Sequence, residues 1–328
     1  MTRIVVALGG NAISRAGEAG TWEEARENAR SVVAPLARMA SKGTEIILTH
    51  GNGPQVGNLL LQQEATREVA PLPLDALGAA TEGWIGYLLQ QELGYALSRS
   101  GVLRPVIPVV TRVEVSGKDP AFAHPTKPIG RYYSDNEARL LTKQRGWTMV
   151  HDMARGGWRR VVPSPHPQRI VEGPVLRRML EEGFGRRMVL LLAGGGGVPV
   201  VAKAGGRFEG VEAVIDKDRT AALLARSLGA DELAILTDVD HVSIGFRTPR
   251  ERRLGRVAAS QLRTYLEGGE FGEGSMRPKV EAALSFISDG GRRALITDAE
   301  HFAHALQGTA GTIVESRAPD KRRASVVR

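Results

Sequence analysis

Short apolar runs alternate with longer amphipathic stretches along almost the whole of this 328-residue chain. Brief apolar runs between turn residues are typical of buried strands, and the longer stretches carry the period of helices that cover a sheet. The sequence predicts strands at Ile4–Leu8, Ile46–Thr49, Val106–Val110, Val189–Leu192, Leu233–Thr237, Ala294–Thr297 and Thr312–Val314. It predicts helices at Trp22–Ser41, Gln55–Glu68, Ala76–Arg99, Val175–Glu182, Lys217–Leu228, Ala258–Glu267, Pro278–Ser288 and Glu300–Gln307. This alternation indicates an α/β fold in which helices cover both faces of a mainly parallel sheet.

Residues 112–167 interrupt this alternation. They are rich in proline and glycine and contain the strings HPTKPIGRYYS and VVPSPHP. Such a stretch between β/α units is either an inserted subdomain or a long functional loop. Further along, the string VPVVAKAGGRFEG predicts a small hairpin within residues 196–210. Residues 317–328 are basic and lack periodicity, which predicts a frayed tail.

The composition excludes several classes of protein. Cysteine is absent, so the chain has no disulfide framework and no thiolate metal site. It contains no apolar window long enough to span a membrane and no signal peptide at its start, so we expect a cytoplasmic enzyme. The net charge of +8 suits nucleic acid or acidic small substrates. Because the basic residues are not interleaved with aromatic ones, we expect no nucleic-acid partner.

Glycine-rich stretches are expected at the ends of strands: Gly9-Gly10-Asn11, Gly51-Asn52-Gly53, Gly194–Gly197 and Gly274-Ser275-Met276. The carboxyl ends of parallel strands share one edge of the sheet, where ligands bind. The stretch THGNGPQVG has two interpretations. It forms a turn, or it presents backbone amides to an anion at the start of a helix near Pro54. Several such stretches at one edge favour phosphate binding, although none matches a P-loop or a dinucleotide-binding motif.

Two lysines stand at predicted helix starts beside small residues, Lys217 in VIDKD and Lys279 in GSMRPK. Phosphoryl transfer needs cations that neutralise charge on the moving group, and lysines placed there can reach a phosphate. Asp216 and Asp218 flank Lys217. They are either helix-capping residues or, in the case of Asp218, a carboxylate that holds the two lysines in place.

Asp238 and Asp240, in LTDVD, are candidates for Mg²⁺ ligands, for nucleotide contacts or for plain turn residues. The seven histidines show no metal-binding spacing, and we interpret His301 and His304 as structural. The serine-hydrolase elbow G-x-S-x-G and the zinc motif H-E-x-x-H are absent.

Together these stretches resemble those of the carbamate kinases, which are members of the amino acid kinase family. The resemblance extends over about residues 3–316 and rests on several strings in the same order. They are VVALGGNA, THGNGPQVGNLLLQQEA, PTKPIG, GGGGVPV, VEAVIDKDRTAALLA, LTDVD and GSMRPKVEAA.

The resemblance implies a single domain over residues 1–316, built as an open αβα sandwich. A first lobe of about residues 1–210 would bind carbamate or carbamoyl phosphate, and a second of about residues 211–316 would bind ATP or ADP. Residues 112–167 would protrude as a lid. It also implies a homodimer and a reversible, Mg²⁺-dependent reaction, ATP plus carbamate giving ADP plus carbamoyl phosphate. The family usually runs it toward ATP, in arginine or ureide breakdown.

The resemblance also assigns roles to residues. Lys217 and Lys279 would stabilise the transferred phosphoryl group, Asp218 would organise them, and Lys127 would reach over the site from the lid. The residues expected to bind the small substrate are Gly9, Gly10, Asn11, Gly51, Asn52 and Gly53. Those expected to bind the nucleotide are Asp216, Lys217, Thr237, Asp238, Asp240, Ser275, Met276 and Lys279. Mg²⁺ would be carried by the nucleotide, without a direct protein ligand.

The chain departs from the family pattern at three places. His166 replaces a usual lysine, Arg277 replaces a usual glycine, and Ser243–Pro249 replaces the usual stretch after DVD. These departures bear on nucleotide preference and rate. The alternatives are a kinase of the same fold with an amino acid, phosphonate or nucleoside monophosphate as acceptor, and a non-catalytic phosphate-binding regulator.

Overall fold

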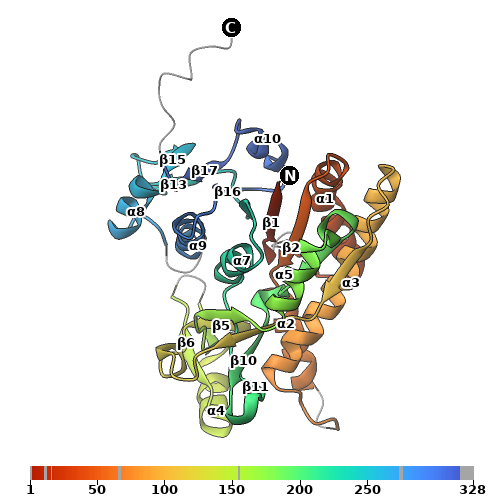
Figure 1. Ribbon diagram of the computed structural model, residues 1–328. Coiled ribbons are helices and arrows are strands. Elements are labelled where there is room, and N and C mark those ends of the chain that lie inside the picture. Colours follow the sequence, from red (N-terminus) through yellow and green to blue (C-terminus); the bar gives the residue numbers. More distant parts are fainter. Residues whose placement is uncertain are drawn as a thin grey trace.

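An eight-stranded sheet forms the centre of the molecule in the computed structural model, which describes residues 2–10, 13–15, 17–65, 68–153, 156–272 and 276–317 (Figure 1). The strand order is β15-β17-β16-β12-β1-β2-β9-β3. In chain order the strands are β1 (Arg3–Leu8), β2 (Glu45–His50), β3 (Val106–Val109), β9 (Val189–Leu192), β12 (Glu232–Leu236), β15 (Arg256–Ala258), β16 (Arg293–Thr297) and β17 (Thr312–Glu315). From β16 to β3 all neighbours are parallel, whereas β17 runs antiparallel to β16. The predicted mainly parallel α/β sheet is confirmed.

Helices cover both faces of this sheet because successive strand residues point to opposite sides. On β1, Val5 and Ala7 join one apolar core, whereas Ile4, Val6 and Leu8 join the other. The first core is shared with α5 (Gly173–Glu181), α7 (Lys217–Ser227), α8 (Ala259–Glu267) and α9 (Met276–Ser288). The second is shared with α1 (Trp22–Ser41), α3 (Leu74–Arg99) and α10 (Phe302–Gln307). The predicted helices are confirmed, with bounds that differ by a few residues at most.

A third and smaller core joins α2 (Gly53–Ala65) to residues outside the central sheet. Val56 of α2 is buried with Leu74 and Leu77 of α3 and with Ile129 and Val162. The last two residues belong to the stretch that interrupts the β/α alternation, so α2 connects that stretch to the rest of the molecule.

Residues 112–167 contribute to two additional sheets. Both ends of the stretch, β4 (Arg112–Val115) and β8 (Pro167–Ile170), lie in a four-stranded sheet of order β11-β10-β4-β8. Its other strands, β10 (Val198–Ala202) and β11 (Phe208–Gly210), are antiparallel and confirm the predicted hairpin. The middle of the stretch forms a separate sheet of order β5-β7-β6, accompanied by one helix (Figure 1). Its elements are β5 (Lys127–Tyr133), α4 (Asp135–Arg145), β6 (Thr148–His151) and β7 (Trp158–Val162).

The remaining elements are short. They are α6 (Phe184–Arg187), β13 (Val242–Ile244), β14 (Arg252–Leu254) and the 3-10 turns η2 (Pro120–Phe122), η3 (Gly194–Gly196) and η4 (Ala204–Gly206). The departure at Ser243–Pro249 lies in β13 and in the turn that leads to β14. Within the described residues, no helix combines the length and apolarity that crossing a membrane requires.

One sequence expectation about the sheet is wrong. The stretch Gly274-Ser275-Met276 does not follow a strand, because the preceding element is α8 and Met276 opens α9. Gly274 and Ser275 themselves lie outside the described residues, as do Asn11 and all but the first residue of the basic tail 317–328. The sites predicted at Asn11 and Ser275 therefore receive no structural account.

Candidate active site

A small cavity of about 210 Å³ lies at the carboxyl edge of the sheet, where β1, β2 and β9 end. The turns after these three strands contribute Gly10, the Gly51–Gly53 stretch and Gly195. The other lining residues are Pro54, Lys127, Val214, Ile215, Asp216, Lys217, Asp218, Pro278 and Lys279. Segments far apart in the sequence therefore meet at the edge where ligands bind in parallel sheets.

The glycines of these turns are needed because the backbones approach closely. A Cβ atom on Gly51 would lie 3.0 Å from the Gly10 nitrogen and 3.4 Å from Cδ of Lys217. Gly195 has a φ of +69°, and a Cβ atom there would lie 2.2 Å from the Asn52 amide nitrogen. Larger residues would push the three turns apart. The cavity is therefore lined at this end by backbone rather than by side chains.

Two lysines from different helices meet on one buried carboxylate. The Lys279 Nζ atom lies 3.1 Å from Oδ2 of Asp218, while the Lys217 Nζ atom pairs with Oδ1 of the same side chain. The side chain of Asp218 is only 4% exposed, and those of the two lysines are 15% and 12% exposed. Because both carboxylate oxygens are engaged, Asp218 fixes the ammonium groups side by side next to the cavity.

Asp216 links the β5–β7–β6 sheet to the start of α7. Its Oδ2 atom lies 3.0 Å from Nζ of Lys127, while Oδ1 accepts hydrogen bonds from the backbone amides of Asp218 and Arg219. Burial alone would raise the pKa of Asp216, but the charge and hydrogen bond of Lys127 hold this pKa below its usual range. Asp216 therefore caps the helix and binds a lysine at the same time.

The buried side chains of His50 and Asn52 form hydrogen bonds that hold the glycine turn after β2 in place. The His50 ring is fully buried, which lowers its pKa to about 4 and keeps the ring neutral at neutral pH. Its Nδ1 atom lies 3.0 Å from the Gly51 carbonyl oxygen and donates a hydrogen bond to it. The Asn52 side chain donates to the hydroxyl of Thr81 on α3 at 2.8 Å. Sequence reasoning did not assign His50 or Thr81, although a histidine inside THGNGPQVG was a signal for the first.

The structure does not bring every predicted residue to this cavity. Among the described residues, its lining omits Gly9, Thr237, Asp238, Asp240 and Met276. Gly9 packs against β12, where a Cβ atom would lie 2.9 Å from the Leu236 carbonyl oxygen. Asp240 pairs with Arg253 at 2.7 Å. Of the described residues predicted to bind a nucleotide, only Asp216, Lys217 and Lys279 line this cavity.

The donors of the cavity fit phosphate oxygens better than a metal ion. Two of the three lysines hold the oxygens of Asp218, and the third holds Asp216. Over the described residues, no group of three or more carboxylate, histidine or cysteine side chains is arranged to hold a metal. The cluster of ammonium groups and backbone amides is the chemistry that binds anions.

Two of the departures from the family pattern have clear structural partners. Arg277 points along α9 and pairs with Glu281 at 2.9 Å, and Glu281 also pairs with Arg219 of α7 at 3.0 Å. The bulk of Arg277 is therefore engaged on the helix surface between α7 and α9. His166 lines a separate cavity of about 220 Å³ beside Arg219 and Arg226.

Comparisons with known proteins place this fold and cavity in one family. The model of the amino acid kinase family matches residues 2–298, and the chain belongs to that family. The chain is 44% identical over 315 residues to a carbamate kinase of Pyrococcus horikoshii, covering 95% of this chain and 98% of that protein. It is also 44% identical over 313 residues to a carbamate kinase-like protein of Escherichia coli, covering 94% and 97% of the two chains. The solved structure of a Giardia lamblia carbamate kinase bound to AMP-PNP has a TM-score of 0.87 at 36% identity, covering 96% and 98%.

Proposed function

We propose that this chain catalyses reversible phosphoryl transfer from ATP to carbamate, which gives ADP and carbamoyl phosphate. The observation that carries the proposal is the pair of lysines held on Asp218 beside a small, glycine-lined cavity. A volume of about 210 Å³ is below that of most drug-sized ligand pockets, which begin at about 300 Å³. It suits a small acceptor better than a nucleotide.

The proposed step needs no strong base. The carbamate oxygen is already anionic, so it forms the new bond to the γ-phosphorus while the bond from phosphorus to the ADP oxygen breaks. Lys217 and Lys279 approach the transferred group from α7 and α9 and would neutralise its negative charge. The amides of the glycine turns would orient the acceptor. Mg²⁺ carried by the nucleotide would add positive charge at its phosphates.

Lys127 would act as the movable part of this site. It comes from the β5–β7–β6 sheet, and its side chain is 37% exposed, more than those of the other two lysines. Its bond to Asp216 is the ion pair that joins this sheet to α7 within the cavity. We propose that residues 112–167 include a lid, that the first lobe holds the acceptor and that the second holds the nucleotide, near Thr237, Asp238, Asp240 and Met276.

The assembly and the direction of the reaction remain predictions. The expected homodimer fits the exposed aromatic side chains of Trp22 and Tyr87, which stack with ring centroids 6.1 Å apart on α1 and α3. Flow toward ATP is expected from the resemblance alone. Sedimentation of the purified protein would measure its oligomeric state. The net rate of ATP formation with ATP, ADP, carbamate and carbamoyl phosphate all present would measure the direction of the reaction.

A second candidate function is formation of a different acyl phosphate. The Escherichia coli relative is named a carbamate kinase-like protein and is also 44% identical to this chain. Identity at this level therefore does not by itself specify the acceptor. The two candidates share the lysines and differ in the acceptor alone.

The decisive experiment is ATP formation by the purified protein from ADP, Mg²⁺ and carbamoyl phosphate, with acetyl phosphate in a parallel reaction. We expect turnover with carbamoyl phosphate that falls at least about 10²-fold in kcat in the Lys217→Ala variant, with a much smaller change in KM. Lys203→Ala, at an exposed hairpin position, is the matched control. Turnover with acetyl phosphate alone would favour the second candidate, and a change confined to KM would contradict the role given to Lys217.

A further inference from the structure

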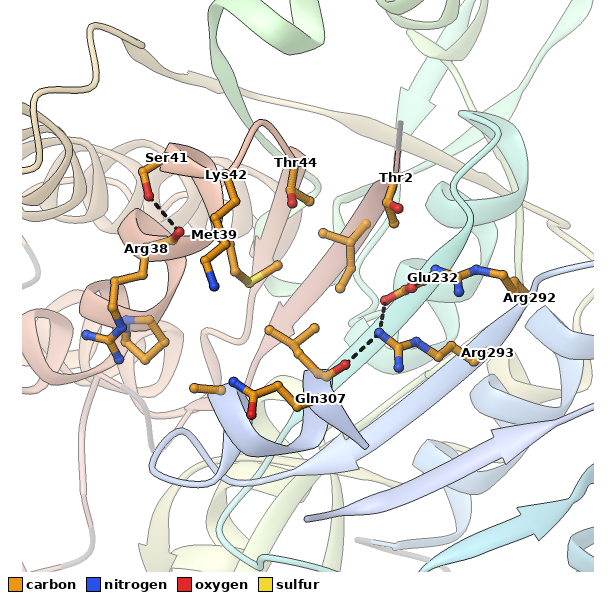
Figure 2. A pocket seen from close by; sticks show the side chains of 14 residues that line it. Thr2, Arg38, Met39, Ser41, Lys42, Thr44, Glu232, Arg292, Arg293 and Gln307 are labelled. Atoms are coloured by element: carbon orange, nitrogen blue, oxygen red, sulfur yellow. Dashed lines mark hydrogen bonds and ion pairs between the residues drawn. The ribbon is translucent and has the colours of Figure 1, made fainter. Parts of the chain in front are cut away.

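A second cavity lies at the opposite, amino edge of the central sheet. Its volume is about 530 Å³, within the range of small-molecule sites. Figure 2 shows side chains from the start of β1, the end of α1, the starts of β12 and β16, and α10 around one space. The cavity therefore joins the first 44 residues of the chain to residues 232–307.

The charged side chains of this cavity are mostly cationic. Arg38, Lys42, Arg292 and Arg293 line it, and the single carboxylate among the lining residues is Glu232. Glu232 is buried and is already engaged by Arg292 and Arg293. Within the described part of the chain, neither Arg38 nor Lys42 has a side-chain ion pair, so their positive charges remain available to a ligand.

The two unpaired cations are not required to end helix α1. A helix terminus does favour positive charge. Here, however, the buried guanidinium of Arg104 already donates to the carbonyl oxygens of Ala40 and Thr44, at 3.3 and 2.8 Å. Arg38 and Lys42 are also four residues apart, a spacing at which like charges repel on a helix. Their position beside a cavity therefore favours the binding of an anion.

Arg293 adds positive charge from the other side of the cavity. Its NH2 group donates to Glu232 at 2.9 Å, as Figure 2 shows, and to the Leu306 carbonyl oxygen at 3.0 Å. Its Nε atom is buried and has no acceptor among the described residues. Because this atom is buried, Arg293 contributes positive charge to the cavity rather than a free donor.

The other lining residues include the apolar Ile4, Pro35, Met39 and Leu306, together with the polar side chains of Thr2, Ser41, Thr44 and Gln307. We infer that this cavity is a binding site for a small organic anion, a carboxylate or phosphate ester with an apolar body. The oxyanion lies between Arg38, Lys42 and Arg293, and the body packs on the apolar side chains. This site is separate from the phosphoryl-transfer cavity and does not depend on the function proposed for it.

Binding can be measured by ¹⁹F NMR with two probes, 4-(trifluoromethyl)benzoate and 4-(trifluoromethyl)phenyl phosphate. We expect the signal of at least one probe to broaden with wild-type protein, and the preferred probe identifies the headgroup. The broadening should persist in Lys217→Ala, whose change is at the other edge of the sheet. The broadening should fall at least about tenfold in the double variant Arg38→Ala/Lys42→Ala, which removes the two cations proposed to bind the anion. Both positions are exposed, so we expect this variant to keep its fold.

The matched control is Arg177→Ala/Arg178→Ala, which removes two exposed cations from α5 and changes the net charge equally. It should bind the probes like the wild type. The inference is overturned if neither probe broadens at millimolar concentration. The inference is also overturned if both double variants lose broadening to the same extent, because binding would then follow net charge. Loss of broadening in Lys217→Ala would overturn it as well, because the probe would then occupy the phosphoryl-transfer cavity.

Discussion

The two edges of the central sheet differ in how much of their positive charge is paired with carboxylates. At the carboxyl edge, each of the three lysines forms an ion pair with a carboxylate. The side chains of these carboxylates, Asp218 and Asp216, are only 4% and 12% exposed. At the amino edge, Arg292 and Arg293 are paired with Glu232, but Arg38 and Lys42 are exposed and have no ion pair in the described part of the chain. In the proposed reaction, the first arrangement would be preorganised for the charge on the transferred phosphoryl group, because the cations need not rearrange. The second leaves positive charge available for the reversible binding of the anion inferred above.

The largest effect at the carboxyl edge should come from Asp218→Asn. The amide keeps the size of the side chain but cannot bind two ammonium groups, so Lys217 and Lys279 would repel each other and lose their positions. We expect kcat for ATP formation to fall at least about 10²-fold with a smaller change in KM. Steady-state kinetics at matched folded fractions, judged by circular dichroism, would measure it. A variant that keeps wild-type kcat would show that the lysines position themselves.

The buried histidine below the glycine turns should make stability depend on pH. The His50 pKa is about 4 in the folded protein and about 6.5 in an unfolded chain, so the unfolded state binds the proton first. Stability is therefore lost as the pH falls from 6.5 toward 4, by about 3 kcal/mol from this group at the low end. His50→Asn keeps a donor for the Gly51 carbonyl and removes the titration.

Urea unfolding at pH 7, 6, 5 and 4.5 would compare His50→Asn with wild type and with His124→Asn, at an exposed position. We expect the His50 variant to lose less stability over this range than the other two proteins. Parallel curves for all three would mean that the ring is not held neutral and buried.

A smaller effect is expected from the exposed lysine of the carboxyl edge. Lys127→Ala removes the ion pair between the β5–β7–β6 sheet and Asp216, which is 89 positions away in the sequence. We expect the KM for carbamoyl phosphate to rise about tenfold, or about 1.4 kcal/mol, with the fold kept. Lys118→Ala, on the loop before η2, is the control. Unchanged kinetics in both variants would make Lys127 an ordinary surface residue.

The sequence predicted seven of the eight strands of the central sheet and the helices that cover them, because their patterns are local, but it missed the three-residue edge strand β15. Helix α1 has the predicted bounds, and its start is marked by the capping box of Thr21 and Glu24. The strands of residues 112–167 were not predicted, because they are short and largely exposed. β6, for example, has no buried residue. Their pairings also join segments far apart in sequence, as in β4 with β8 and β10.

The candidate site was predictable only in part for a related reason. Glycine-rich strand ends and lysines at helix starts are visible in the sequence, and the structure brings most of them to one cavity. The pairing of Asp218 with Lys279, 61 positions away, was among the predictions. The pairing of Asp216 with Lys127, 89 positions away, was not, because nothing local in the sequence marks it. The cations of the amino edge were not considered at all, because isolated arginines and lysines on a helix end are indistinguishable from surface charge until the fold places them around a cavity.

The smallest effect should separate the two edges most clearly. Arg38→Ala/Lys42→Ala removes exposed charges without ion pairs in the described chain, so its free energy of unfolding should stay within about 0.5 kcal/mol of wild type. Relief of repulsion between positions four residues apart would even favour the variant slightly at low salt. Urea unfolding at low and high salt would measure this. A loss above about 1 kcal/mol would mean that the two cations stabilise the end of α1, and both edges would then use their charges to hold the fold.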